Sequence, residues 1–180
     1  MSFNKDAFFH EDNYCQIELL PIQNLLVKRN ETDFAKDQLD KNFTEHGFVN
    51  ITSRSQTTHP LTNLDIAVNQ FTAILQEDSL FFLDKVYTGY STHRSLRKNT
   101  HGFVFENYIL YYEFNDNFIT KSWIDYNLFS DTLNCYPKRL QMALFKLGGY
   151  FNLILIDWNE LITIILKDEA ALTDYINEIL

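Results

Sequence analysis

The sequence has few glycines, prolines and cysteines, and it lacks long apolar runs. Among 180 residues there are 5 Gly and 3 Pro, which argues against long flexible linkers. The 2 cysteines, Cys15 and Cys135, lie far apart and form no CxxC pair, so free thiols are expected. No run approaches the roughly 20 apolar residues of a membrane helix, and residues 1–14 lack the pattern of a signal peptide. These features predict a cytoplasmic protein that does not enter a membrane.

The sequence also lacks the motifs that are typical of catalytic, phosphate-binding or metal-binding sites. It contains no GxSxG, GxGxxG or GxxxxGK[ST] motif. Its 5 histidines form neither HxxxH nor HExxH, which are the usual helical zinc spacings. We therefore expect no catalytic residue, no cofactor and no metal, and a protein that is not an enzyme.

Positive charge is scarce as well. The chain has 15 Lys and Arg against 24 Asp and Glu, a formal net charge of −9. A negative surface repels phosphate backbones, so nucleic acid is not an expected partner. The same charge favours association with a basic protein surface, although acidity also serves simply to keep a protein in solution.

Apolar and aromatic residues, by contrast, are plentiful enough for a full core. They make up 46% and 16% of the chain, and 180 residues suit one domain, 1–180. Strand-like patterns occupy 13–22, 48–53, 84–90, 103–114, 118–126, 153–156 and 161–166. Helix-like patterns occupy 31–47, 63–76, 137–149 and 168–180, and 91–102 is predicted to be a polar loop. Consecutive strands joined by tight turns predict an α+β fold with a mainly antiparallel sheet and helices packed on one face.

Asp157 is the acid whose position most resembles that of a catalytic residue, because it follows a buried strand. In an open parallel sheet, a carboxylate at that place often meets a ligand. Only a few residues separate this strand from the next, however, and they leave no room for a crossover helix. The pattern therefore predicts a hairpin whose turn is formed by Asp157.

Two groups of residues are typical of protein interfaces. The first, at 85–103, combines aromatic and basic or imidazole side chains, which often anchor interfaces: Tyr87, Tyr90, His93 and Arg94. The second consists of the acids near the first strand and the residues around the turn at 157–160: Glu11, Asp12, Glu18, Asp157, Trp158 and Glu160. We take these ten residues as candidates for contact with a partner.

The alternative is a domain, enzymatic or not, that binds a small ligand. Its pocket would be lined by Tyr87, Tyr90, Tyr111, Trp123 and the loop between His93 and His101. A third reading is self-association through the aromatic hairpin at 103–126. The sequence thus leaves open a monomer or a homodimer.

Three stretches together resemble small immunity proteins of bacterial polymorphic and contact-delivered toxin systems. They are FFHEDNYCQIELLP at 8–21, VYTGYST at 86–92, and LILIDWNELITI at 153–164 followed by a short terminal helix. The resemblance implies that the protein neutralises one cognate toxin by stoichiometric binding, without chemistry. An acidic protein of this kind would suit a basic toxin, such as a nuclease.

Overall fold

The computed structural model describes residues 6–44, 47–48, 54–90, 93–126 and 137–178. The strand expected over 48–53, Cys135 and His46 lie wholly or mostly outside these residues. Within the described residues, no helix combines the length and apolar composition that a membrane crossing requires.

The main sheet has seven strands, and every neighbouring pair in it is antiparallel. Its spatial order is β12 (Ile162–Ile165), β11 (Leu153–Asp157), β2 (Ile17–Pro21), β10 (Phe118–Tyr126), β9 (Tyr108–Asn115), β8 (Thr100–Phe105) and β5 (Phe81–Leu83). The hairpins expected over 103–126 and 153–166 are therefore confirmed, and so is the α+β fold.

A smaller sheet was not expected from the sequence. Its order is β1 (Asp6–His10), β6 (Lys85–Tyr90) and β7 (His93–Leu96). β1 pairs with β6 in parallel, and β7 occupies part of the predicted polar loop at 91–102. The remaining strands, β3 (Phe43–Thr44) and β4 (Gly47–Phe48), form a two-stranded pair.

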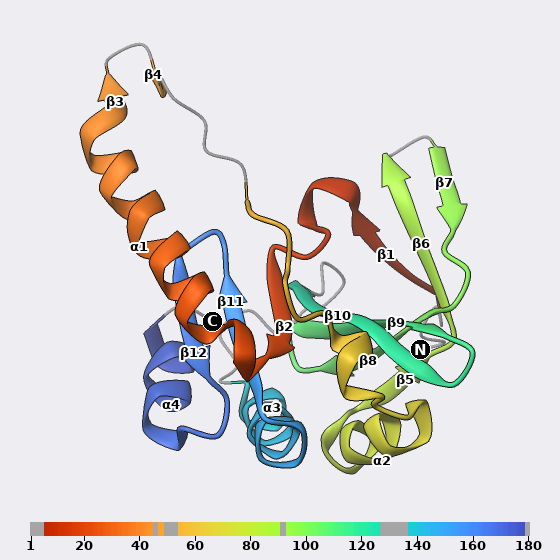
Figure 1. The fold of residues 1–180 in the computed structure, drawn as a ribbon. Coiled ribbons are helices and arrows are strands. Elements are labelled where there is room, and N and C mark those ends of the chain that lie inside the picture. Colours follow the sequence, from red (N-terminus) through yellow and green to blue (C-terminus); the bar gives the residue numbers. More distant parts are fainter. Residues whose placement is uncertain (1–5, 45–46, 49–53, 91–92, 127–136, 179–180) are drawn as a thin grey trace.

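The two faces of the main sheet are covered differently (Figure 1). Three helices cover one face: α2 (Val68–Asp78), α3 (Lys138–Phe151) and α4 (Glu169–Glu178). The fourth helix, α1 (Leu25–Asn42), packs its first turn against the opposite face, on β11 and β12. The small sheet covers the rest of that face over β8, β9 and β10. The expectation that the helices pack on one face thus holds for three of the four α-helices in the described residues.

Alternation along β2 explains how the faces are assigned. Ile17 and Leu19 pack in the large core under the helices, whereas Leu20 packs with Ile154 and Ile156 on the other side. Glu18 shares this second face with its cross-strand partners Trp123 and Ile156. A carboxylate is therefore placed between two large apolar neighbours on a sheet face.

The prediction for α1 was wrong at its N-terminus, because the helix starts at Leu25 rather than near residue 31. A 3-10 turn at Ile22–Asn24 leads straight into it. The buried Asn24 side chain holds this junction by donating to the His59 carbonyl at 2.8 Å and accepting from the His59 N–H at 3.2 Å. The helical spacing of Phe34 and Leu39 is typical of a core-facing stripe, yet these side chains are 55% and 43% exposed.

The helix-like pattern at 137–149 ends at the glycine pair 148–149, but α3 continues to Phe151. It ends at Asn152, which has the left-handed φ of 53°. Gly148 instead allows close packing, because a Cβ there would lie 2.5 Å from Leu166 Cβ and 2.7 Å from the Lys167 nitrogen. A Cβ on Gly149 would meet nothing within 4 Å.

These neighbouring glycines should respond in opposite ways to the same change. Gly148→Ala should lower the free energy of unfolding by about 2 kcal/mol or more, because the segment after β12 must move. Gly149→Ala should raise it by about 0.5–1 kcal/mol, because alanine stabilises an exposed helical site. Urea denaturation of both variants measures the difference, and equal losses in the two would contradict this account of the packing.

Candidate functional site

The structure brings together the two parts of the second predicted group, the acids near the first strand and the turn at 157–160, although Glu18 and Trp158 lie 140 residues apart in sequence. Trp158, in the turn after β11, donates its backbone N–H to the Gln16 carbonyl at 2.9 Å. Its indole Nε1–H donates to Glu18 Oε1 at 2.8 Å. The acid on β2 and the tryptophan of the turn at 157–160 therefore form one unit.

The remaining predicted residues lie on the small sheet or directly after its first strand. His10, at the end of β1, pairs with Gly89 on β6, so the exposed Glu11 and Asp12 follow next to the β6–β7 hairpin. Arg94 on β7 places its guanidinium 4.6 Å from the centre of the Phe8 ring. His93 is exposed on the same strand, and Tyr87 on β6 is half-buried. The side chain of Tyr90 lies outside the described residues.

Asp157 has to be removed from the partner-contact candidates, because it is buried and used within the fold. Its Oδ1 accepts the N–H groups of Asn159 at 2.9 Å and Glu160 at 3.2 Å. Its Oδ2 accepts the Tyr175 hydroxyl at 2.8 Å. These bonds confirm that Asp157 forms the turn, and they tie this turn to α4.

The Glu18 carboxylate lies in the seam, the strip of the main sheet between the parts covered by α1 and by the small sheet. Burial raises the pKa of this carboxyl above its ordinary value. The hydrogen bond from Trp158 and the positive charges of Lys28, Arg54 and Lys121 act in the opposite direction without cancelling the effect. Ionised Glu18 therefore costs folding free energy at neutral pH.

Two cations fix the Trp158 ring. The Arg54 guanidinium lies 4.6 Å from the ring centre and donates to the Cys15 carbonyl at 3.1 Å. The ammonium of Lys28 lies 5.2 Å from the ring and pairs with Glu31 at 2.9 Å, although Lys28 is almost fully buried. The tryptophan is thus held in place by cation–π contacts as well as by its hydrogen bonds.

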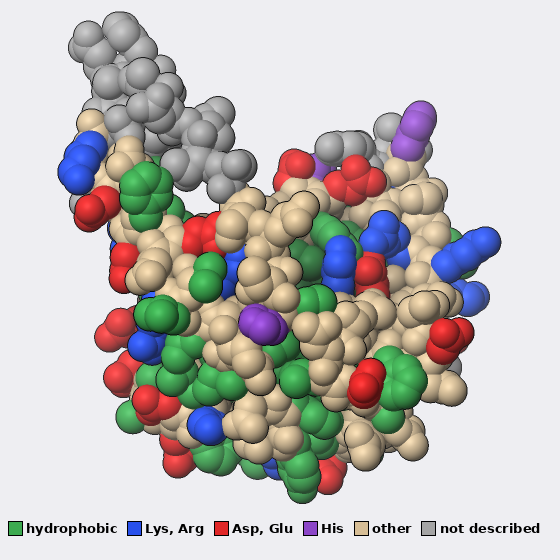
Figure 2. All heavy atoms as spheres, viewed as in Figure 1, with side chains coloured by type: hydrophobic (Ala, Val, Ile, Leu, Met, Phe, Trp, Pro, Cys, Tyr) green, Lys and Arg blue, Asp and Glu red, His purple; other side chains and the backbone are tan. Residues whose placement is uncertain are grey.

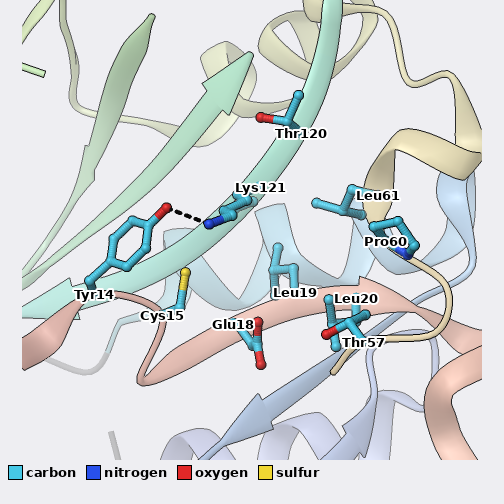
Figure 3. A pocket seen from close by; sticks show the side chains of 11 residues that line it. Tyr14, Cys15, Glu18, Leu19, Leu20, Thr57, Pro60, Leu61, Thr120 and Lys121 are labelled. Atoms are coloured by element: carbon cyan, nitrogen blue, oxygen red, sulfur yellow. Dashed lines mark hydrogen bonds between the residues drawn. The ribbon is translucent and has the colours of Figure 1, made fainter. Parts of the chain in front are cut away.

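A pocket of about 240 Å³ opens at the seam (Figure 3). Figure 3 shows Tyr14, Cys15 and Lys121 on one side of it, with Pro60 and Leu61 on the other. Its lining is mainly apolar with a few polar groups: Tyr14, Cys15, Glu18, Leu19, Leu20, Thr57, Pro60, Leu61, Thr120, Lys121 and Ser122. The hollow therefore combines an apolar lining with a carboxylate and an ammonium.

A chain of hydrogen bonds sets the position of Lys121 in this wall. Its ammonium donates to the Tyr14 hydroxyl at 2.8 Å and lies 4.8 Å from the ring centre of Tyr14. The hydroxyl in turn donates to Glu113 Oε2 at 3.0 Å, and Glu113 forms an ion pair with Arg97. Lys121 is therefore oriented by the Tyr14 hydroxyl, whereas the carboxylate of Glu113 forms its ion pair with Arg97.

Cys15 and Tyr14 are poor choices for chemistry in this pocket. Burial raises the pKa of the Cys15 thiol to about 12, so the nucleophilic thiolate is scarce at neutral pH. Burial also raises the pKa of the Tyr14 hydroxyl, which therefore stays protonated. Among the described residues, no three His, Cys, Asp or Glu side chains are grouped to hold a metal ion.

The aromatic pocket of the alternative hypothesis is not formed by the residues predicted for it. Tyr111 and Trp123 are fully buried and stack on each other with ring centres 5.3 Å apart. His101 lies in the main sheet and packs against Phe82 and Tyr112, whereas His93 belongs to the small sheet. Tyr111 and Trp123 fill the core because the small sheet covers β9 and β10.

Comparison with protein-family models, with curated proteins and with solved structures finds no significant match for this chain.

The energetic cost of Glu18 can be tested by Glu18→Gln, which keeps an oxygen to accept the Trp158 N–H. Because the folded pKa is raised, the stability linked to Glu18 is present below pH 4.5 and is lost as pH rises through the folded pKa. A glutamine side chain does not ionise, so the variant does not lose this stability as pH rises. At pH 7 it should therefore be at least as stable as the natural protein. The difference in free energy of unfolding between the variant and the natural protein should shrink as pH falls toward 4.

Glu113→Gln is the matched control for this measurement. The same chemical change there breaks the ion pair with Arg97 and weakens the bond from Tyr14, so about 1 kcal/mol should be lost at pH 7. Urea denaturation at both pH values measures each effect. If Glu18→Gln destabilises the protein at pH 7 as much as Glu113→Gln does, Glu18 is a net stabilising charge.

Proposed function

We propose that this protein is a cytoplasmic, immunity-type inhibitor that neutralises a cognate protein toxin by stoichiometric binding. The contact surface in this proposal, the binding face, comprises Glu11, Asp12, Glu18, Tyr87, His93, Arg94 and Glu160, together with the pocket. Trp158 is buried and takes part by positioning Glu18, so it is removed from the partner contacts. The observation that carries it is the charge of Glu18, which is placed where it costs folding energy and opens into a surface pocket. Groups that lower stability in this way are typical of functional sites.

The shape of the molecule around the pocket supports a macromolecular partner. α1 on one side and the β6–β7 hairpin on the other rise from the same face of the main sheet (Figure 1). Figure 2 shows basic and acidic side chains lying side by side between these two projections. A recessed centre with a polar, charged rim is the usual anatomy of a specific protein interface.

The pocket is also small for the ligand of an enzyme. Its volume of about 240 Å³ lies below the approximately 300–1,000 Å³ of most small-molecule sites. A hollow of this size suits a single amino-acid residue of a partner, and interfaces draw most of their affinity from a few such anchored residues. The protonated states of Cys15 and Tyr14 further favour binding over covalent catalysis.

A small-ligand-binding domain remains the second candidate function. The specific observation in its favour is that Glu18 and Lys121, two titratable groups of opposite charge, line the same pocket. Convergent titratable groups in a hollow are a general mark of ligand sites.

The proposal is tested with the protein encoded directly upstream of this chain, if that protein carries a toxin domain. We expect a 1:1 complex and loss of the toxin's activity. Reversing the rim acids with Glu11→Lys and Asp12→Lys should slow association about tenfold at low salt. The difference in association rate between the variant and the natural protein should become smaller as salt is added, because salt screens the charges at the rim.

The control reverses two exposed acids on α4, with Asp174→Lys and Glu178→Lys, which makes the same change in net charge away from the binding face. Stopped-flow association rates of both variants should then differ clearly. Equal slowing by the two variants would place the contact elsewhere, and a complex that leaves the toxin active would rule out inhibition.

A further inference from the structure

Oε2 of the Glu18 carboxylate offers the pocket a negatively charged hydrogen-bond acceptor without a protein donor among the described residues. Among the described residues, the hydrogen-bond donor to the Glu18 carboxylate is Trp158 Nε1, and it reaches only Oε1. Lys28, Arg54 and Lys121 act on Glu18 through their charges, but none lies within ion-pair distance of it. Oε2 is therefore available to a donor that enters the pocket.

The pocket also contains one open positive charge. The ammonium of Lys121 donates to the neutral Tyr14 hydroxyl, and in the described part of the chain no carboxylate lies within 4 Å of it. An ammonium has three donors, so two remain for a ligand. The ring of Tyr14 and the hydroxyl together hold the ammonium in place at the wall.

Between these charges the pocket is apolar. Leu19, Leu20, Pro60 and Leu61 supply this surface, and Figure 3 shows Leu61 and Pro60 across the pocket from Tyr14 and Lys121. The volume corresponds to about eight water molecules at about 30 Å³ each. This matches the bulk of a medium-sized aliphatic amino acid.

Charge balance decides which ligand suits such a pocket. A simple cation would bind beside Glu18 but would meet the repulsion of Lys28, Arg54 and Lys121. A simple carboxylate would bind to Lys121 but would leave Oε2 of Glu18 unsatisfied and add a like charge. A molecule that carries both charges satisfies both groups and leaves the net charge of the pocket unchanged.

From this complementarity we infer that the pocket binds a free aliphatic α-amino acid. Its ammonium donates to Glu18 Oε2, its carboxylate accepts from Lys121, and its side chain packs on Leu19, Leu20, Pro60 and Leu61. The site belongs to the binding face but does not depend on a protein partner. Binding here would make the protein responsive to a metabolite.

Three probes of nearly equal shape test the inference: L-leucine, L-leucinamide and 4-methylpentanoate. The amide lacks the carboxylate, and the acid lacks the ammonium. The readout is the pair of indole N–H resonances of the 2 tryptophans in ¹⁵N-labelled protein. L-Leucine should shift the Trp158 resonance with a Kd in the millimolar range or tighter. The Trp123 resonance should shift less, because its indole packs on Tyr14 but does not bond to Glu18. Each of the other probes should bind at least tenfold more weakly.

Variants connect any binding to the two charges. Lys121→Met and Glu18→Gln should each weaken L-leucine binding at least tenfold, while Lys36→Met on exposed α1 should leave it unchanged. No shift of Trp158 at tens of millimolar L-leucine overturns the inference, and so does equal binding of all three probes. Neither result touches the proposed inhibition, which is measured with the rim acids and a protein partner.

Discussion

The hydrogen bond from the Trp158 indole to Glu18 is the interaction on which the binding face depends. It links the start of β2 to the turn after β11 across 140 residues, and cation–π contacts from Arg54 and Lys28 hold the indole in place. Without this donor, the carboxylate would be left among Trp123, Ile156 and Leu20 with no hydrogen bond from a described residue. A buried carboxylate without a partner is expensive, so the bond is what allows the charge to stay on this face.

Topology explains why a hollow forms beside this bond. One face of the main sheet is covered by two separate bodies, α1 over β11 and β12 and the small sheet over β8, β9 and β10. Neither body covers the border between β2 and β10, and Glu18 and Lys121 lie on those two strands. The seam is thus a consequence of how the covering layers divide the sheet, and the pocket takes its polar groups from the strands that meet there.

Sequence patterns predicted the parts of this arrangement that have a local cause. The strand-like pattern at 13–22 predicted β2, where Glu18 and Leu20 share one face by alternation, and the short DWNE segment predicted the turn formed by Asp157. The parallel pairing of β1 with β6 joins segments about 80 residues apart and leaves no local signal. For the same reason Lys121, Tyr14, Lys28 and Arg54 were missed, because each is an ordinary polar residue until pairing brings it to the seam. Tyr111 and Trp123 were misplaced because the sheet that buries them was not foreseen.

The central claim is that Glu18 is a desolvated carboxylate held by Trp158 at the edge of a pocket. Its most direct test is an NMR titration that follows the Glu18 side-chain carboxyl carbon together with both indole N–H resonances. The account predicts a Glu18 pKa above the ordinary value of 4.5, with the hydrogen-bonded Trp158 resonance shifting in step and by more than that of Trp123, which neighbours Glu18 without bonding to it. A pKa at or below 4.5, with a Trp158 resonance that does not follow it, would contradict the account.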